Sequence, residues 1–549
     1  MRVGIYSVSL SRLRASERRM DASSRSHHPP NWDRLVVAIL LVAAVAPFAR
    51  TLMFGYVMDD TMVIRSNPDL AGWGSLWRVW THGYGGEDSS YLGLYRPLTM
   101  AVFAFVWNAG GHWPLWFHAV AIAMHAGATI LVWRVAGLGV ARGPAALAAL
   151  WFAVHPVHVE AVANVANSSE VMVAIWTCLL TLHLAHRSRT AAPISWPAAA
   201  VAGALYLAAF LSKESGAVTP VLAALWVWGC RRDELFADRG PAWIARRWRT
   251  VLVAWAVVAV VVVVVRSVVL GGPITGQAIA APGIDELSSA GRLRAMLSLG
   301  PVFLGLLTWP RQINPHYGPT TFPTTGATSI ALLTLAALAA VLVLAARLAV
   351  RGDRRFLAAT LWVLVAFLPA SNLIVPTGQL LAERTLYVPS IGVVLLVASG
   401  LDALWVKAHG AAGWRAARVI AVAILGVVIG ASWSRTARWT EVWRSHDALF
   451  SQMITADTAG YRGYWLSGLE AHRLGESENA LLLLARAHGL YPRDKGLVID
   501  YAQTLLAVGR AREARGDTAT AAALYREGVR IAPRDTALQT RLRALRVAP

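Results

Sequence analysis

The amino-acid sequence predicts an all-α protein in two parts: a polytopic bundle of membrane-spanning helices and a C-terminal domain of paired helices in water. Of the 549 residues, 56% are hydrophobic and 15% are charged, whereas soluble domains average about 25% charged residues. The mean hydropathy is +0.49. Apolar residues also gather in blocks as far as about residue 433, and each block has roughly the 20 residues that a helix needs to cross a bilayer.

Eleven apolar blocks are expected to span the membrane. Two further apolar stretches, about 97–109 and 296–309, are short for a crossing, so we expect interfacial or re-entrant helices there. The expected spans cover about residues 35–53, 116–136, 144–163, 169–186, 193–211, 216–230, 250–270, 328–346, 356–371, 386–405 and 416–433.

The positions of the basic residues orient these spans. Lys and Arg gather in segments such as 1–34, 231–249 and 347–355, whereas the longer loops on the other side carry fewer. Cytoplasmic loops carry this excess of positive charge. The N-terminus is therefore expected in the cytoplasm, and an odd number of spans places the C-terminal domain on the opposite side. We expect a multi-pass protein of a bacterial inner membrane with a periplasmic C-terminal domain.

Composition divides the chain into a disordered cytoplasmic tail at 1–33, a transmembrane domain at 34–434 and a repeat domain at 435–549. The tail has no apolar core or cleavage site of a signal peptide. The net charge is +20, but the arginines are dispersed among short loops, so no nucleic-acid partner is expected. Cys178 and Cys230 lie in or beside apolar segments, which argues against a disulfide framework.

The C-terminal domain contains an internal repeat that resembles tetratricopeptide repeats. Their usual period is about 34 residues, whereas the repeat here has a spacing of 41 residues. The longer spacing predicts one to two extra helical turns near Arg510–Arg515. Residues 435–465 are expected to form a cap against the membrane domain. The repeats are expected to offer a concave surface to a protein partner, with a purely structural role as the alternative. Three residue pairs recur 41 positions apart: Gly475 and Gly516, Ala480 and Ala521, and Pro492 and Pro533.

Polar and ionisable residues near span ends fall on the predicted non-cytoplasmic side. Such groups at membrane depth are costly unless they are paired or face water, so they usually mark a functional cavity. We therefore predict a single functional site at this face. Its candidate residues are Asp59, Asp60, Arg96, His155, His158, Glu160, Lys213, Glu214, Arg311, Glu383, Arg384 and Tyr387.

Asp59 and Asp60 lie just outside the first expected span. A carboxylate in a dry, partly buried cavity can act as a general base that deprotonates a hydroxyl. The alternative is a helix cap, or an ion-pair partner for Arg65 or Arg96. Both interpretations fit the sequence.

His155, His158 and Glu160 have three interpretations. Two histidines three positions apart share a helix face, which suits a metal site, hydrogen bonds to a sugar or phosphate, or helix packing. A catalytic zinc takes three protein ligands, and no nearby third ligand is obvious in the sequence. We therefore predict no metal site, with a divalent metal left as an open alternative.

Two neighbouring acid–base pairs also have two interpretations each. Lys213 and Glu214 either neutralise each other at the interface or leave Lys213 to meet a lipid phosphate as a point charge. Arg384 either pairs with a neighbour such as Glu383 or holds a phosphate, whose geometry an arginine fork matches.

Five stretches, in their order along the chain, resemble the family of transmembrane and tetratricopeptide-repeat-containing protein O-mannosyltransferases and their bacterial relatives. The resemblance covers about residues 35–549 and includes the C-terminal repeats. The ordered set is fairly specific. The matching stretches are Tyr56–Asp69 (YVMDDTMVIRSNPD), Tyr95–Leu98 (YRPL), His155–Ala161 (HPVHVEA), Leu211–Ser215 (LSKES) and Ala382–Ser390 (AERTLYVPS).

The resemblance implies a GT-C fold with its active site on the non-cytoplasmic face. It implies a donor sugar, typically mannose, on a polyprenyl phosphate, and an acceptor hydroxyl on a protein. An acidic residue of the first outer loop is the family's proposed base, which carries over to Asp59 or Asp60. We expect inversion at the anomeric carbon, with Lys213 and Arg384 neutralising the departing phosphate and no cofactor. The chain has few repeats for this family, so a glycan acceptor is the alternative to a protein.

Two other classes of function compete with a transferase. A non-enzymatic scaffold would display the repeats to an envelope complex, but eleven spans are far more than an anchor needs. A transporter or flippase would favour polar residues near mid-membrane and broken helices in paired halves. Here the polar groups gather at one end, which favours the transferase.

Overall fold

The computed structural model describes residues 31–86, 93–189, 192–230, 241–272, 281–284, 286–311, 314–322, 326–407 and 412–547. The predicted N-terminal tail lies almost entirely outside these described residues. Within them the chain is helical, and Tyr317 and Leu381 form one isolated antiparallel bridge. The predicted all-α class is confirmed.

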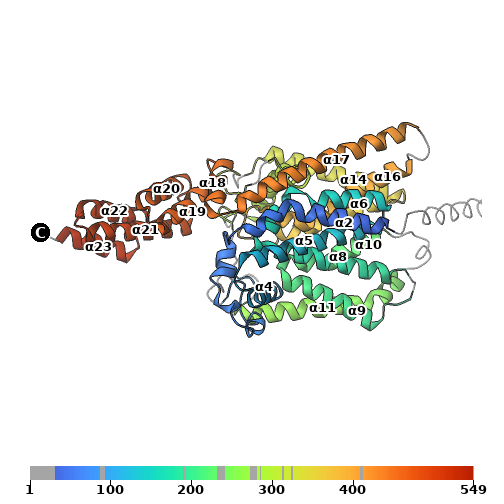
Figure 1. The fold of residues 1–549 in the computed structure, drawn as a ribbon, viewed down its shortest axis with the longest axis horizontal. Coiled ribbons are helices and arrows are strands. Elements are labelled where there is room, and N and C mark those ends of the chain that lie inside the picture. Colours follow the sequence, from blue (N-terminus) through green and yellow to red (C-terminus); the bar gives the residue numbers. More distant parts are fainter. Residues whose placement is uncertain are drawn as a thin grey trace, which may run out of the picture.

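The helices form a bundle followed by an elongated row of shorter helices (Figure 1). The bundle also contains short helical turns: η1 (Ala46–Met53), η2 (Thr61–Arg65), η3 (Pro68–Leu70), α3 (Ser75–Arg78), η5 (Pro156–His158), η6 (Val165–Ser168), η7 (Glu214–Val218), η9 (Leu368–Ala370), η10 (Glu383–Leu386) and η11 (Glu441–Trp443). Its main helices are α2 (Trp32–Val45), α4 (Pro97–Gly110), α5 (Pro114–Ala136), α6 (Arg142–Ala153), α7 (Val159–Ala163), α8 (Ser169–Arg187), α9 (Trp196–Ser212), α10 (Thr219–Gly229), α11 (Pro241–Val269), α12 (Ser289–Ser298), α13 (Gly300–Thr308), α14 (Thr328–Val350), α15 (Arg355–Phe367), α16 (Tyr387–Lys407) and α17 (Ala412–Thr440).

Helices occur at all eleven positions where spans were expected. In the described part of the chain, seven helical segments are long and apolar enough to cross a membrane, and nine are if each bent pair counts as one span. The bent pairs are α6 with η5–α7, at 50°, and α12 with α13, at 43°. The chain is therefore a multi-pass membrane protein by the length and composition of its helices. The seven segments are Trp32–Met53, Pro114–Ala136, Val165–Arg187, Arg246–Val269, Thr328–Val350, Glu383–Lys407 and Gly413–Trp443.

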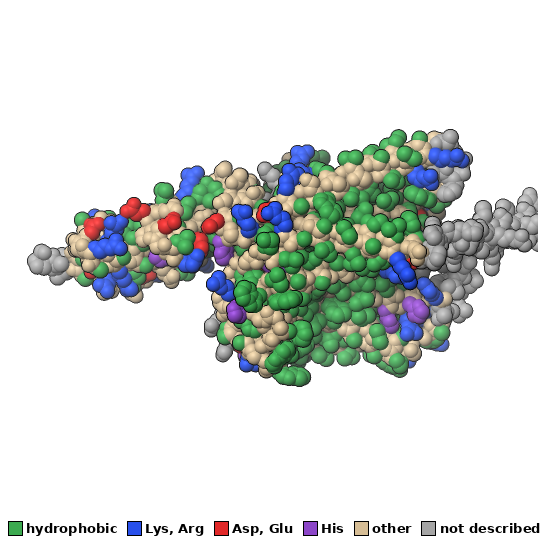
Figure 2. All heavy atoms as spheres, in the orientation of Figure 1, with side chains coloured by type: hydrophobic (Ala, Val, Ile, Leu, Met, Phe, Trp, Pro, Cys, Tyr) green, Lys and Arg blue, Asp and Glu red, His purple; other side chains and the backbone are tan. Residues whose placement is uncertain are grey.

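Small residues let the central helices pack closely. Ala145, Ala148 and Ala149 on α6 are fully buried, as are Ala358 and Ala359 on α15. Small side chains at helix contacts allow backbones to approach, which is how helices associate in a membrane. By contrast α11 and α14 expose most of their apolar side chains, so they form the outer layer. Figure 2 shows the resulting apolar surface of the bundle beside the mixed charges of the row of shorter helices.

Several helices of the bundle are interrupted at the end nearest the C-terminal domain. Pro156 follows the end of α6, and α9 and α10 are separated by the turn η7. The turn η10 precedes α16 and packs against η5 and α7. A broken helix exposes backbone groups and turns side chains sideways, and such breaks are tolerated only where protein or water satisfies them. The breaks bring polar residues of separate helices together.

The C-terminal domain is a stack of paired helices, as the 41-residue spacing predicts. Gly475 and Gly516 both have φ +83° and each follows the end of the first helix of a pair. Asp494 and Asp535 each accept two backbone N–H groups at the start of the next helix. The expected extra turns are present, because α21 extends to Ala514. The helices are α18 (His446–Ala456), α19 (Tyr461–Arg473), α20 (Ser477–Leu490), α21 (Lys495–Ala514), α22 (Thr518–Ile531) and α23 (Thr536–Val547).

The junction between the two parts is continuous. Helix α17 extends through the boundary expected at 434, and Trp443 packs into the core of the bundle. Arg50 at the end of the first span forms a 2.9 Å salt bridge with Glu441. The segment between Thr440 and α18 is therefore held against the bundle.

Candidate active site

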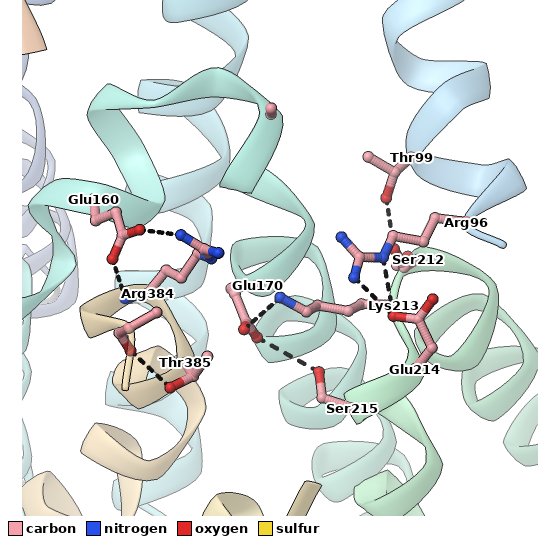
Figure 3. Close-up of polar contacts among 12 residues, drawn as sticks. Arg96, Thr99, Glu160, Glu170, Ser212, Lys213, Glu214, Ser215, Arg384 and Thr385 are labelled. Carbon is pink, nitrogen blue, oxygen red and sulfur yellow. Dashed lines mark hydrogen bonds and ion pairs between the residues drawn. The ribbon is translucent and has the colours of Figure 1, made fainter. Parts of the chain in front are cut away.

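Three ion pairs lie together at the interrupted end of the bundle (Figure 3). In the first, Arg96 precedes α4, and its Nε and Nη2 both donate to Glu214 Oε2 at 2.9 Å. The Arg96 guanidinium carbon lies 4.7 Å from the centre of the Tyr84 ring. Tyr84 is buried and donates its hydroxyl hydrogen to Ala166 O at 2.6 Å. Arg96 is thus held by a carboxylate and an aromatic face, which satisfies a buried charge.

In the second pair, Lys213 bonds to Glu170 and not to its sequence neighbour. Lys213 Nζ donates to Glu170 Oε1 at 2.7 Å, and Ser215 Oγ lies 3.5 Å from Oε2. The backbone of Lys213 is extended, with φ −163° and ψ 152°, so the side chains of Lys213 and Glu214 point to opposite sides. Glu170 lies in the first turn of α8, where the helix dipole favours a carboxylate.

In the third pair, Arg384 bonds to Glu160 of α7. Glu160 Oε2 accepts the Arg384 backbone N–H at 2.8 Å, and its Oε1 forms an ion pair with the Arg384 guanidinium. The adjacent Glu383 instead accepts the Tyr317 hydroxyl at 2.6 Å and the Asn314 backbone N–H at 3.0 Å. Successive residues of a helical turn do not face each other, which separates these two carboxylate networks.

The three cations form one electrostatic cluster. Figure 3 shows the charged ends of Arg384, Lys213 and Arg96 pointing toward a common region. Burial lowers the pKa of Lys213 below its usual value, and the charges of Arg96 and Arg384 lower it further, whereas Glu170 opposes that shift. The cations therefore act on one another, and the carboxylates hold them together.

Asp60 is enclosed in the protein. Its side chain is 1% exposed, and Oδ1 accepts the Ala166 N–H at 2.7 Å. Burial raises the pKa of Asp60 to about 7, and the charge of Asp59 adds to the rise, while backbone donors oppose it. In this position Asp60 fastens the first outer loop to the turn η6.

Asp59 is half-buried, unlike its neighbour Asp60. Among the residues that the structure describes, its carboxylate forms neither a hydrogen bond nor a salt bridge. Its negative charge nevertheless acts on Tyr84 and on Arg384. The preceding residue, Met58, has φ +54°, a strained conformation of the kind that collects at functional sites. Asp59 is thus a half-buried carboxylate without a bonded partner in the described part of the chain, and its charge acts on the cation cluster.

The two candidate histidines and the candidate tyrosine lie among packed helices. His158 Nε2 is 2.9 Å from Ser390 Oγ, and its ring contacts those of Phe152 and Tyr387. His155 Nδ1 accepts the Val157 N–H at 3.2 Å and so begins η5. These side chains position the third and tenth expected spans relative to each other.

Arg311 lies outside the cluster, with an exposed side chain. In the described portion of the chain, no three His, Cys, Asp or Glu side chains gather as metal ligands would. The candidate cluster is thus built from carboxylates, basic groups and hydroxyls.

Several curated proteins that are similar to this chain are described as protein O-mannosyl-transferases. Protein O-mannosyl-transferase Tmtc3 of Drosophila melanogaster is 27% identical over 95% of this chain. Tmtc1 of the same fly is 27% identical over 81% of the chain, and human TMTC3 is 23% identical over 87%. The chain is thus similar in sequence to proteins that are named Tmtc protein O-mannosyl-transferases.

The chain spans 62% of the length of fly Tmtc3, 60% of fly Tmtc1 and 54% of human TMTC3. No family model and no solved structure matches it.

The sequence predicted Arg96, Lys213 and Arg384 as members of one site but did not predict the partner of Lys213. Glu170 carried a usable signal, since it is a carboxylate inside an apolar stretch, and such residues usually have a functional role. Tyr84 and Tyr317 carried no comparable signal. Aromatic residues are common near membrane interfaces, so only the fold distinguishes these two.

Proposed function

We propose that this chain is a membrane glycosyltransferase that moves a mannosyl group from a polyprenyl-phosphate donor to a hydroxyl group of a protein. The observation that carries the proposal is the half-buried Asp59 carboxylate beside the buried cluster of Arg96, Lys213 and Arg384. The names of the similar proteins support the sugar and the protein acceptor.

Asp59 acts as the general base in this proposal. It takes the proton of the acceptor hydroxyl as the acceptor oxygen attacks the anomeric carbon. The bond between that carbon and the phosphate oxygen breaks, and the polyprenyl phosphate leaves with the electron pair. One displacement of this kind inverts the anomeric carbon. A positioned base typically contributes about 10²- to 10⁴-fold to the rate.

The cation cluster receives the charge that develops on the leaving phosphate. Each cation is already paired, but each retains unused donors: an ammonium has three and a guanidinium has five. Lys213 gives one to Glu170, and Arg96 gives its Nε and Nη2 to Glu214. The remaining donors are pre-oriented by the carboxylates, and donors fixed before the reaction stabilise developing charge at low cost. A divalent metal is not needed in this scheme.

Asp59 is favoured over Asp60 because of what each carboxylate already does. The buried Asp60 oxygen holds the Ala166 N–H, so proton transfer there would compete with a structural hydrogen bond. A raised pKa alone suits a base, but a base must also reach its proton donor. Asp59 is less buried than Asp60, and its carboxylate holds no such hydrogen bond among the described residues.

We further propose that the cluster lies on the non-cytoplasmic side of a cell membrane. The basic segments that include Arg347, Arg351 and Arg354 lie at the opposite end of their helices from the cluster, and positive loops remain cytoplasmic. The repeat domain then shares a compartment with the active site, where it meets the protein acceptor.

The test is transfer of radiolabelled mannose from polyprenyl-phosphate mannose by the purified full-length protein in lipid vesicles. An envelope extract supplies acceptors, and the chemical nature of the labelled product distinguishes a protein from a glycan. We expect protease-sensitive label with the wild-type protein. If the reconstituted protein neither transfers nor binds the mannolipid, the proposal is wrong.

A further inference from the structure

A hydrogen bond joins the repeat domain to the loop that carries Asp59. The Met58 backbone N–H donates to His446 Nε2 at 3.2 Å, across 388 positions of the chain. His446 is the first residue of α18, and Met58 directly precedes Asp59. A contact from the repeat domain therefore reaches the residue next to the proposed base.

The conformation of Met58 makes this contact consequential. With φ +54°, Met58 lies in the left-handed region, which is unfavourable for residues other than glycine. A residue keeps such a conformation only where the surrounding structure fixes it. Asp59 follows immediately, so the direction of its side chain depends on that geometry. In the described part of the chain, His446 is the side chain that bonds to this backbone amide.

His446 is itself held in place. Its ring stacks on Phe450 at 5.4 Å between centroids, and Phe450 belongs to the bundle core. Because Nε2 accepts a hydrogen bond, the ring is neutral with its proton on Nδ1. Burial lowers the pKa of His446, which favours this neutral form. The charged groups that act on it are Glu470, Arg473, Asp447 and Arg65.

Other contacts keep α18 and α19 fixed to the bundle. Glu441, before α18, pairs with Arg50, and Asp457, after it, accepts a hydrogen bond from the Thr321 hydroxyl. The ring of His316 packs edge-on against that of Tyr461 at 6.1 Å. Contacts before and after α18 therefore hold the helix that carries the His446 imidazole against the bundle.

We propose that His446 is a positioning residue for the reaction: it fixes the Met58 backbone so that Asp59 points at the acceptor. The first helix of the repeat domain is then part of the active-site wall. The kinetic consequence rests on the proposed transferase function, whereas the structural consequence does not.

The kinetic test compares three full-length variants in vesicles. His446→Ala removes the acceptor, His446→Gln places an amide oxygen near the position of Nε2, and His488→Ala is the matched control. His488 contacts Tyr501 within the repeat domain. A small displacement of a catalytic group can cost up to about 100-fold in rate. We expect kcat to fall about 10- to 100-fold in His446→Ala with unchanged affinity for the mannolipid, to recover in His446→Gln, and to stay unchanged in His488→Ala.

Hydrogen–deuterium exchange of the peptide that covers residues 54–62 tests the hydrogen bond without any activity. We expect exchange at least about 10-fold faster in His446→Ala, restored by His446→Gln, because a lost acceptor exposes the Met58 amide. Unchanged exchange, or an unchanged kcat in an active His446→Ala protein, would overturn the proposal. If the wild-type protein is inactive, the transferase proposal fails and the exchange result alone decides the role of His446.

Discussion

The charged residues of the cluster form ion pairs, and the pair of Lys213 with Glu170 is the most enclosed of the three. Their side chains are 12% and 3% exposed. Breaking a buried pair strands a charge and costs about 3–5 kcal/mol, whereas replacing both partners by apolar residues is often neutral. Comparing the single substitution with the double substitution therefore separates what the pair contributes to stability from what Lys213 contributes to catalysis.

We predict that Glu170→Gln lowers the Tm of the detergent-purified protein because it leaves the Lys213 charge unpaired. The double variant Lys213→Met with Glu170→Leu should recover the Tm and still lack mannose transfer, since the cation that meets the phosphate is gone. Thermal unfolding and transfer are measured on the same preparations. Transfer at the wild-type rate by the double variant would show that Lys213 is structural only.

A second prediction concerns Asp60, whose pKa is raised from 3.8 to about 7 by burial. The folded protein binds this proton more tightly than the unfolded chain, so stability is lost as pH rises from 3.8 to about 7. Each pH unit in that interval costs on the order of 1 kcal/mol of unfolding free energy. Asp60→Asn should remove this loss, and its Tm should exceed that of the wild-type protein at pH 8. Parallel Tm–pH profiles of the two proteins would contradict the assignment.

That polar and charged residues gather at one end of the helices was predictable from the sequence, but their pairing was not. Lys213 and Glu214 are neighbours and looked like partners, yet the extended backbone at Lys213 turns them apart. Asp59 and Asp60 likewise differ in burial because of their place in one loop. Which neighbour faces inward depends on tertiary packing, which local sequence does not encode.

Helix breaks are the elements that assemble the cluster, and the break between α9 and η7 is the tightest. Gly216 lies against the backbone of Ala209, so a Cβ at this position would overlap the Ala209 carbonyl group. The turn η7 therefore folds back on the end of α9 only with glycine there. This fold-back places Lys213 and Glu214 between Glu170 and Arg96.

We predict that Gly216→Ala destabilises the protein by about 1–3 kcal/mol, as overpacking does, and reduces transfer because it displaces Lys213. Gly426→Ala is the matched control, since a Cβ there meets open space on the exposed face of α17. Tm and transfer are compared for both. Equal values for Gly216→Ala and the control would show that the fold-back is not required.

Element positions followed well from hydrophobic blocks, because burial in lipid and in the bundle both demand apolar residues. Lengths followed less well: α9, α10 and α15 have 17, 11 and 13 residues. Short turns extend these helices: η7 follows α9, and η9 follows α15. The repeat spacing predicted the long α21 correctly, since insertions lengthen a helix pair without breaking its packing.

At the scale of the whole molecule, the proposed topology places the N-terminus and the repeat domain on opposite sides of the membrane. We predict that alkaline phosphatase fused after residue 549 is active in a bacterial host. Alkaline phosphatase that replaces the chain after residue 231 should be inactive. Alkaline phosphatase becomes active only outside the cytoplasm, so its activity reports the side of each fusion point. The positive charge of the loops predicts which side that is. The reverse pattern would move the cluster to the cytoplasmic side and exclude the proposed donor orientation.

The most direct test of the central claim is mannose transfer by Asp59→Asn beside Asp60→Asn, in vesicles and at saturating donor. A base contributes about 10²- to 10⁴-fold, so Asp59→Asn should lose transfer by that factor and retain mannolipid binding. Asp60→Asn keeps an oxygen that can accept the Ala166 N–H and should transfer at close to the wild-type rate. Full activity in Asp59→Asn, or loss in Asp60→Asn with normal folding, would contradict the account and move the base to Asp60 or elsewhere.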